Sequence, residues 1–115
     1  MKHNFRELNI WKQSIQLVTE LYVLVSQLPS EEKFGLKSQM CRSAVSISSN
    51  IAEGSGRTTN KDFNRFLDIS MASSYELETQ LIISANLYEI DVKELIEKIN
   101  ELQKMIGGFK RTLVI

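Results

Sequence analysis

The residues best suited to binding a charged ligand surround a glycine-rich turn. Residues 50–57 read Asn-Ile-Ala-Glu-Gly-Ser-Gly-Arg, and Lys61 follows four positions later. Backbone N–H groups at such a turn and at the start of the next helix can bind phosphate, and Arg57 and Lys61 would add positive charge. The same glycines can simply end a helix and form a tight connection. Because no strand signal precedes them, the spacing matches neither glycine-rich phosphate motif, and the structural interpretation is favoured.

Two polar residues precede this turn on a segment that otherwise reads as a packed helix. As catalytic groups, Asn50 and Glu53 would need a nucleophile, a histidine or a second carboxylate at suitable spacing, and the sequence supplies none. We therefore predict a structural role. Asn50, Glu53, Gly54 and Gly56 are expected to form a buried hydrogen-bonded network that fixes a helical hairpin.

Basic residues recur through the same part of the chain. The candidates for phosphate contacts are Lys37, Arg42, Arg57, Lys61 and Arg65. Lys61 and Arg65 are four residues apart and share one helix face. Phe63 and Phe66 lie among them, but their spacing is typical of core residues rather than of stacking platforms for bases. Two interpretations stay open: a phosphate-binding patch, strengthened by repetition in an oligomer, or a solvated face paired with neighbouring acidic residues.

Other residue types exclude most catalytic chemistry. His3 is the only histidine and Cys41 the only cysteine, so neither a zinc site nor an internal disulfide is expected. No Glu-x-x-His occurs, which excludes a di-iron carboxylate bundle, and the serines of residues 43–49 have no base beside them. We expect a protein that is not an enzyme and that holds no metal and no cofactor.

Composition is that of an ordinary globular domain. The 115 residues carry 14 basic and 14 acidic side chains, and we expect a single domain over residues 1–115. Dedicated nucleic-acid binders are usually strongly basic, so any such role would depend on local patches. Charge is uneven, because residues 58–90 hold two basic and five acidic side chains. The lone cysteine and the lack of a membrane span or signal-type apolar run predict a cytoplasmic protein without membrane partners.

Four long segments with helical periodicity position these residues. We predict helices over residues 5–27, 36–53 and 60–88, and a fourth that follows a cap at Asp91. Pro29 and the 54–56 turn separate the first three, and one of residues 58–60 is expected to cap the third. Short connections make consecutive helices antiparallel neighbours, which gives an all-α, up-down-up-down four-helix bundle. The small residues of the second and third helices are expected to meet.

The first helix carries two apolar stripes. One has alternating spacings of three and four and is predicted to face the core; it comprises Leu8, Trp11, Ile15, Val18, Tyr22 and Val25. The other comprises Ile10, Leu17, Leu21 and Leu24 and would then remain on the surface. Because exposed apolar patches usually mark interfaces, we predict that this second stripe joins copies of the chain. The alternative is a first helix that its own chain covers on both sides.

Several of these segments resemble one family along nearly the whole chain. The match runs through residues 39–57, the segments 61–67 and 73–78, the pair Leu8 and Trp11, and the pair Pro29 and Glu31. Asn-Ile-Ala-Glu-Gly at residues 50–54 is its most specific part. The chain resembles the small bacterial "four helix bundle protein" family, whose members are encoded in intervening sequences of large-subunit ribosomal RNA genes. That family is similar to the accessory protein of diversity-generating retroelements.

The resemblance implies more than the residues do by themselves. It implies a homopentameric ring of bundles that binds RNA or DNA and a protein partner such as a reverse transcriptase. We therefore expect a non-catalytic homo-oligomer that associates with nucleic acid through basic patches. The alternative is a protein-interaction scaffold without nucleic-acid binding, which would use the acidic surface of the third helix.

Overall fold

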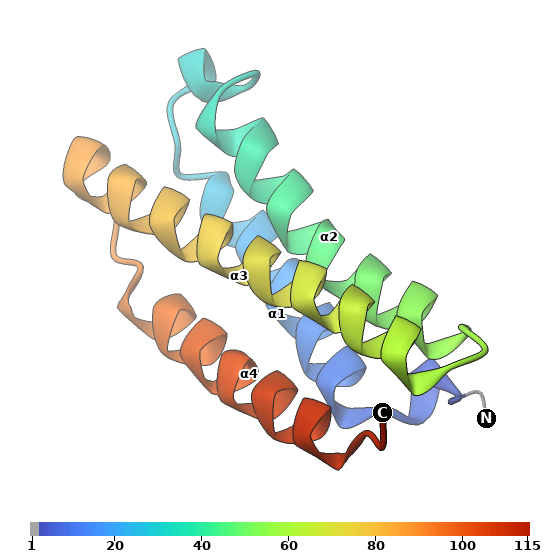
Figure 1. Cartoon of the computed structure of the whole chain (residues 1–115). Helices are drawn as coiled ribbons and strands as arrows, with labels where there is room; N and C mark the ends of the chain where they lie inside the picture. The colour runs from blue at the N-terminus through green and yellow to red at the C-terminus, as the bar shows by residue number, and fades with distance from the viewer. Residues whose placement is uncertain (1–2) are drawn as a thin grey trace.

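Four long helices build the protein in this computed structural model, which describes residues 3–115 (Figure 1). They are α1 (Asn9–Val25), α2 (Leu36–Ser55), α3 (Asn60–Tyr88) and α4 (Lys93–Thr112). Short 3-10 helices, η1 (Phe5–Glu7) and η2 (Ser30–Glu32), precede α1 and α2. No strand occurs in the described part of the chain, so the all-helical class is as predicted.

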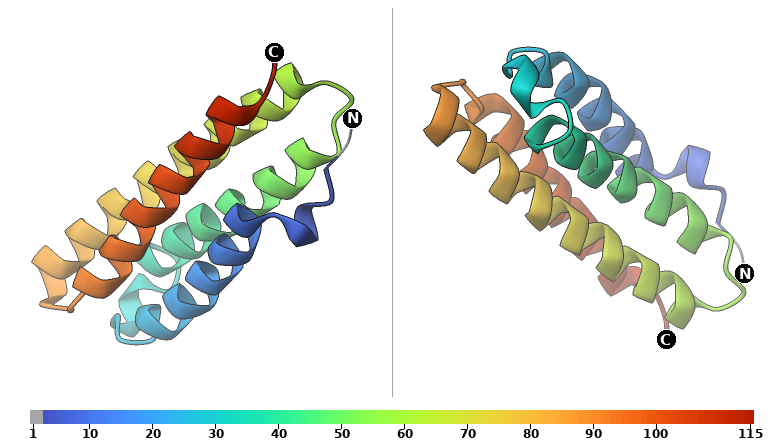
Figure 2. Two further views of the ribbon diagram at one scale, coloured as in Figure 1. Left: turned by 90° about the horizontal axis from the view of Figure 1, so that it is seen from below. Right: turned by 90° about the horizontal axis from the view of Figure 1, so that it is seen from above.

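The helices lie side by side around one apolar core. Consecutive helices pack against each other, and α1 also packs against α4, as the two views of Figure 2 show. The molecule measures 45 × 23 × 20 Å. His3 and the C-terminal residues lie at the same end as the α2–α3 turn. At that end the N–H of His3 donates to the carbonyl of Ser55 over 3.0 Å, and the Asn60 side-chain amide donates to the carbonyl of Val114 over 3.2 Å.

The helix ends follow the predicted signals in part. Thr59 caps α3, because its hydroxyl accepts a hydrogen bond from the N–H of Asp62 at 3.1 Å. Asp91 accepts from the N–H of Lys93 at 3.1 Å, although Val92 is the residue in the N-cap position of α4. Gly107 and Gly108 do not interrupt α4, which continues as helix to Thr112.

Small residues join α2 to α3, as predicted. The hydroxyls of Ser46 and Ser73 are hydrogen-bonded at 2.8 Å, and the hydroxyl of Ser70 donates to the carbonyl of Ile47 at 2.9 Å. Ser48 makes a similar bond to Ser14 of α1, also at 2.9 Å. Each bond satisfies a buried hydroxyl that would otherwise be costly to remove from water. The serines therefore allow close helix approach without leaving unpaired polar groups.

The burial of α1 differs from the prediction, because the stripe predicted to lie on the surface is covered, and the stripe predicted to be core is covered only in part. Ile10, Leu17 and Leu21 are buried in the core, and Leu24 packs against it while partly exposed. The prediction that these residues join copies of the chain is wrong, because the chain's own helices cover them. Of the stripe predicted to be core, Ile15 is 39% exposed and Tyr22 52% exposed. Periodicity shows that two apolar faces exist, but only the placement of α2 and α4 decides which one is covered.

Candidate functional site

The turn between α2 and α3 and the start of α3 carry three of the five predicted basic residues, Arg57, Lys61 and Arg65. Gly54 is buried here against the ring of Phe63 and the β-carbon of Phe66, at a place with no room for a side chain. The chain leaves α2 through Gly56, which has ordinary helical angles, and re-enters a helix after Thr59. Residues 57–65, which form this turn and the start of α3, lie at one end of the molecule (Figure 1).

Two arginines of this turn flank one aromatic ring. The guanidinium carbon of Arg57 lies 4.5 Å from the centroid of Phe66, and that of Arg65 lies 5.1 Å from it. Cation–π attraction at such distances holds both side chains near the ring. Phe66 is buried, as predicted, but sequence reasoning missed its second role as a platform for the two arginines. The sequence signal for this role is that Phe66 directly follows Arg65 and lies shortly after Arg57, across the turn between the two helices.

The acidic partners of these arginines are weak ones. Arg65 pairs with Asp62 at 3.2 Å within one helix, and Arg57 pairs with Glu53 at 3.9 Å. All four side chains are substantially exposed, and exposed pairs of this kind contribute about 0–1 kcal/mol. Lys61 is exposed beside them and forms no ion pair within residues 3–115. An anion that binds at this turn would therefore replace only weak ion pairs.

The other two predicted basic residues lie elsewhere. Lys37 and Arg42 stand near the opposite end of α2. At a rise of about 1.5 Å per residue, Arg42 is roughly 22 Å along the helix from Arg57. Arg42 shares a surface groove between α2 and α3 with Glu76. The five residues thus do not form one patch, and only Arg57, Lys61 and Arg65 share the turn.

The predicted hairpin network is present in reduced form. The side-chain amide of Asn50 donates to the carbonyl of Ser46 at 2.8 Å and to its hydroxyl at 3.1 Å. The Ser46 hydroxyl in turn meets Ser73, so Asn50 is linked to α3 through one intermediate. Glu53 is exposed and takes no part in this network, contrary to the prediction. Gly54 acts through its lack of a side chain.

Folding separates charges that are balanced over the sequence. Three hydrogen bonds mark one level across the four helices, namely Ser14 with Ser48, Ser46 with Ser73, and Ser74 with Gln103. On one side of this level, residues 3–16, 46–74 and 103–115 hold eight Lys or Arg and four Asp or Glu. On the other side, residues 17–45 and 75–102 hold five Lys or Arg and ten Asp or Glu. We call these the basic end and the acidic end.

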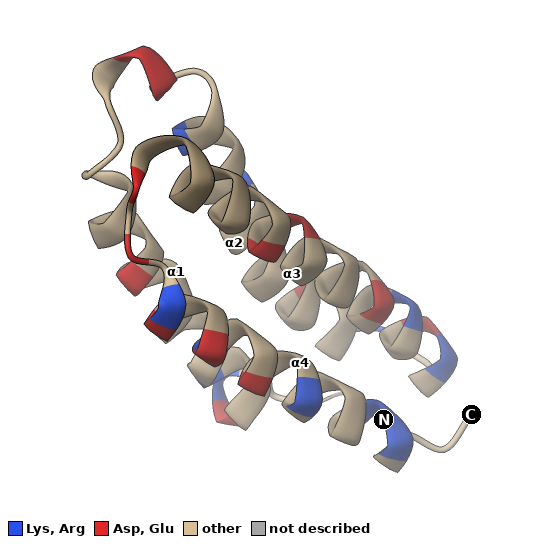
Figure 3. Ribbon diagram, turned by 90° about the vertical axis from the view of Figure 1, so that its left-hand side faces the viewer, with Lys and Arg blue, Asp and Glu red and all other residues tan. Residues whose placement is uncertain are grey.

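The asymmetry is visible along the ribbon. Figure 3 shows blue residues gathered toward the end where the C-terminus lies, and red residues along the first turns of α4. The basic end carries a net charge of +4 and the acidic end −5 over the described residues. Such a separation directs an anionic partner to one end of the molecule even when the total charge is zero. The order of charges along the sequence does not reveal it, because each end is assembled from segments far apart in the chain.

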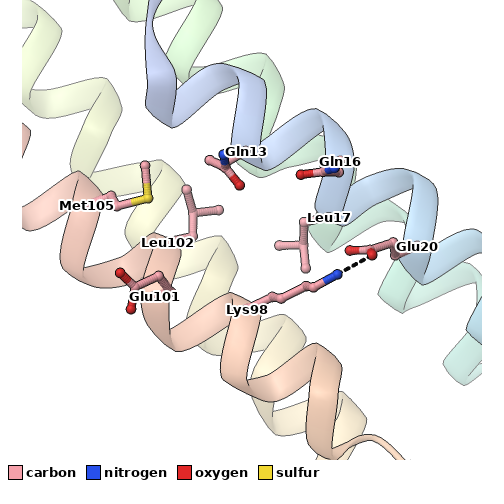
Figure 4. A pocket seen from close by; sticks show the side chains of 8 residues that line it. All are labelled: Gln13, Gln16, Leu17, Glu20, Lys98, Glu101, Leu102 and Met105. Carbon is pink, nitrogen blue, oxygen red and sulfur yellow. Dashed lines mark hydrogen bonds and ion pairs between the residues drawn. The ribbon is translucent and has the colours of Figure 1, made fainter.

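A groove between α1 and α4 is less suited to binding an anion than the α2–α3 turn. Lys98 of α4 crosses it to pair with Glu20 of α1, as the dashed line in Figure 4 marks. The hydrogen bond to Glu20 raises the pKa of Lys98, so its charge is retained and already matched. The groove therefore displays no free cation to a ligand.

No group of three or more His, Cys, Asp or Glu side chains between residues 3 and 115 is arranged to hold a metal ion. None of the helices over that range is both long and apolar enough to cross a membrane.

Comparisons with known proteins support the fold and point to a family. A family model described as "23S rRNA-intervening sequence protein" matches residues 6–108. A crystal structure of a protein of unknown function from the S23 ribosomal protein family of Bacteroides thetaiotaomicron superimposes with a TM-score of 0.81. The two sequences are 21% identical, and the match covers 90% of this chain and 99% of the other. No curated protein matches the chain.

Proposed function

This chain belongs to the 23S rRNA-intervening sequence protein family, and we propose that it is a non-catalytic, homo-oligomeric protein that binds the phosphate backbone of RNA or DNA through its basic end. The proposal rests on chemistry that side chains at this end offer. It needs no nucleophile, metal or acid–base pair.

One observation carries the proposal: Arg57 and Arg65 are both held at the ring of Phe66, beside Lys61, which forms no ion pair within the described residues. Long basic side chains normally lose conformational freedom when they bind a phosphate. Guanidinium groups already held on a ring lose less, and their N–H groups match phosphate oxygens in pairs. Their present acidic partners are exposed and weak, so phosphate can replace them.

The assembly belongs to the same proposal. We infer an antiparallel up-down-up-down order of helices, which the packing of every consecutive pair supports. We further infer a ring of copies, with five copies as the resemblance implies. Ile15 and Tyr22 of α1 and Val45 of α2 supply exposed apolar surface for it. A ring would repeat the basic end and raise a weak phosphate affinity through avidity.

The test measures the binding of a labelled RNA hairpin and of a labelled DNA duplex by fluorescence anisotropy at a series of salt concentrations. The logarithm of affinity should fall linearly with the logarithm of salt concentration. Arg57→Gln and Lys61→Gln should each weaken binding and lower the salt slope by about 1. Lys93→Gln at the acidic end is the matched control and should change neither.

Absence of binding to both probes at about 50 mM salt would refute the proposal, as would an equal loss in Lys93→Gln. One observation favours the alternative of a protein-interaction scaffold, namely the net charge of −5 at the acidic end. That surface suits a basic protein partner, of which a reverse transcriptase is the example implied by the resemblance. A specific complex that survives nuclease treatment, with no nucleic-acid binding, would favour the scaffold.

A further inference from the structure

A shallow hollow between α3 and α4 combines three kinds of side chain that suit a nucleotide. It encloses about 550 Å³ and is lined by Tyr75, Asn100, Gln103, Lys104, Gly107 and Arg111, among others. Sites for small ligands have volumes of about 300–1,000 Å³. The hollow reaches from the middle of the bundle toward the basic end and is separate from the α2–α3 turn.

Its two cations are not matched by acidic side chains. Lys104 and Arg111 form no ion pair within the described residues, whereas the neighbouring Lys110 pairs with Asp68. The Arg111 guanidinium lies along the α4 backbone at its glycine pair. A β-carbon built on Gly107 would be 3.8 Å from Nη1, and one built on Gly108 would be 3.7 Å from Nη2. Because neither glycine has a side chain, the guanidinium remains approachable from the hollow.

An exposed aromatic ring stands across from these cations. Tyr75 of α3 is 55% exposed, and its ring pairs with no other aromatic ring over residues 3–115. Exposed aromatic rings beside basic side chains are the usual surface on which single-stranded nucleic acids stack their bases. A base paired within a duplex does not present its face for such stacking.

Two amides are oriented at the floor of the hollow. Asn100 Nδ2 and Gln103 Nε2 both donate to Glu78 Oε1, at 3.1 and 2.9 Å. Gln103 also donates to the hydroxyl of Ser74 at 3.2 Å, which fixes its direction. The Asn100 side-chain oxygen receives no hydrogen bond from the part of the chain that the structure describes. It is available to accept a hydrogen bond from the exocyclic amino group of a base.

We propose that this hollow is a subsite for one nucleotide of a single-stranded nucleic acid. The base stacks on Tyr75 and its amino group donates to Asn100, while Lys104 and Arg111 contact the flanking phosphates. The inference rests on the proposed function and adds to it a preference for single strands and for bases with an amino group. Adenine and cytosine carry that group, and uracil does not.

The experiment measures dissociation constants for labelled oligo(A) and oligo(U) of about 12 nucleotides and for an RNA duplex of the same length. Tyr75→Ala should weaken oligo(A) binding about tenfold and leave duplex binding unchanged, whereas Tyr75→Phe should retain wild-type affinity. Lys104→Gln combined with Arg111→Gln should weaken binding of both single strands and lower their salt slope. Asn100→Ala should reduce the preference for oligo(A) over oligo(U).

The outcomes separate this proposal from the broader one. If Arg57→Gln weakens every probe but Tyr75→Ala weakens none, the subsite is refuted and the proposed function stands. If the wild-type protein binds no probe, both are refuted. Because Tyr75 is exposed, we expect its replacement to leave the fold intact. Circular dichroism and thermal melting check that each variant is folded before its binding is measured.

Discussion

A β-carbon built on Gly54 would lie 2.7 Å from the β-carbon of Phe66, so α2 and α3 approach closely at these two residues. The same β-carbon would lie 2.8 Å from Cδ1 of Phe63. The neighbour at 2.7 Å is fixed to the α3 backbone and cannot turn away as the end of a flexible side chain can. The glycine thus positions the ring on which Arg57 and Arg65 rest.

We expect Gly54→Ala to destabilise the protein. Alanine would favour the helix by up to about 1 kcal/mol. Overpacking typically costs about 1–3 kcal/mol, and here it requires the two helices to move apart, so we expect a net loss of about 1–2 kcal/mol. Gly56→Ala is the matched control, because the nearest atom to its β-carbon is the Glu53 carbonyl oxygen at 3.7 Å. Urea denaturation measures both, and equal stabilities would contradict the close-approach argument.

The serine contacts between α2 and α3 allow a second test. Ser70 is fully buried and donates to the Ile47 carbonyl, so Ser70→Ala should cost about 0.5–1.5 kcal/mol. Ser70→Leu should cost more, because the larger side chain would separate the helices. Ser49→Ala, on the exposed face of α2, should change stability by less than about 0.5 kcal/mol. Chemical denaturation of the three variants gives the order, and a Leu variant as stable as the Ala variant would show a loose interface.

A third prediction concerns acid pH. Hydrogen bonds from the Tyr88 hydroxyl, and then from the N–H of Leu36, lower the pKa of Glu32 below its usual 4.5. A lowered folded-state pKa contributes stability that is present above pH 4.5 and lost as pH falls through the folded value. Tyr88→Phe should therefore be less stable than wild type at pH 7, and the difference should shrink below pH 4.

Thermal unfolding midpoints across that pH range measure the effect. Tyr75→Phe is the control, since the Tyr75 hydroxyl has no hydrogen bond to the described residues. A difference between Tyr88→Phe and wild type that stays constant from pH 7 to pH 3 would show that the bond to Glu32 does not act through titration.

Much of the fold follows from local sequence signals. The bounds of α3 were predicted at residues 60–88 as observed, because Thr59 supplies a cap and nine apolar or small residues keep one face. The assignment of faces on α1 did not follow, since Ile10 and Ile15 are equally apolar and lie on two regular stripes. Burial depends on where α2 and α4 pack, and helical periodicity contains no information about that.

The candidate site was harder to predict for a related reason. Lys61 and Arg65 are neighbours on one helix, so their grouping was visible in the sequence. Lys104 and Arg111 join Tyr75 only after α4 packs against α3, and nothing in their sequence spacing predicts that contact. Zero net charge hid an end-to-end separation that only the three-dimensional fold produces.

The last prediction tests assembly through the apolar residues of α1 and α2 that are exposed. Tyr22 of α1 lies near Cys41 of α2, whose negative charge when ionised raises the pKa of the Tyr22 hydroxyl. Ile15 is exposed on the same helix, and Val45 is exposed one turn from Cys41. A carboxylate in the middle of an apolar interface would have to be desolvated without a partner. Val45→Glu should therefore convert an oligomer to the 13.2 kDa monomer by light scattering. Val23→Glu introduces the same charge at an exposed position beside the α1–α4 groove and should leave the mass unchanged. A wild-type particle of 13.2 kDa at high concentration would remove the assembly proposal, and with it the avidity expected of a ring.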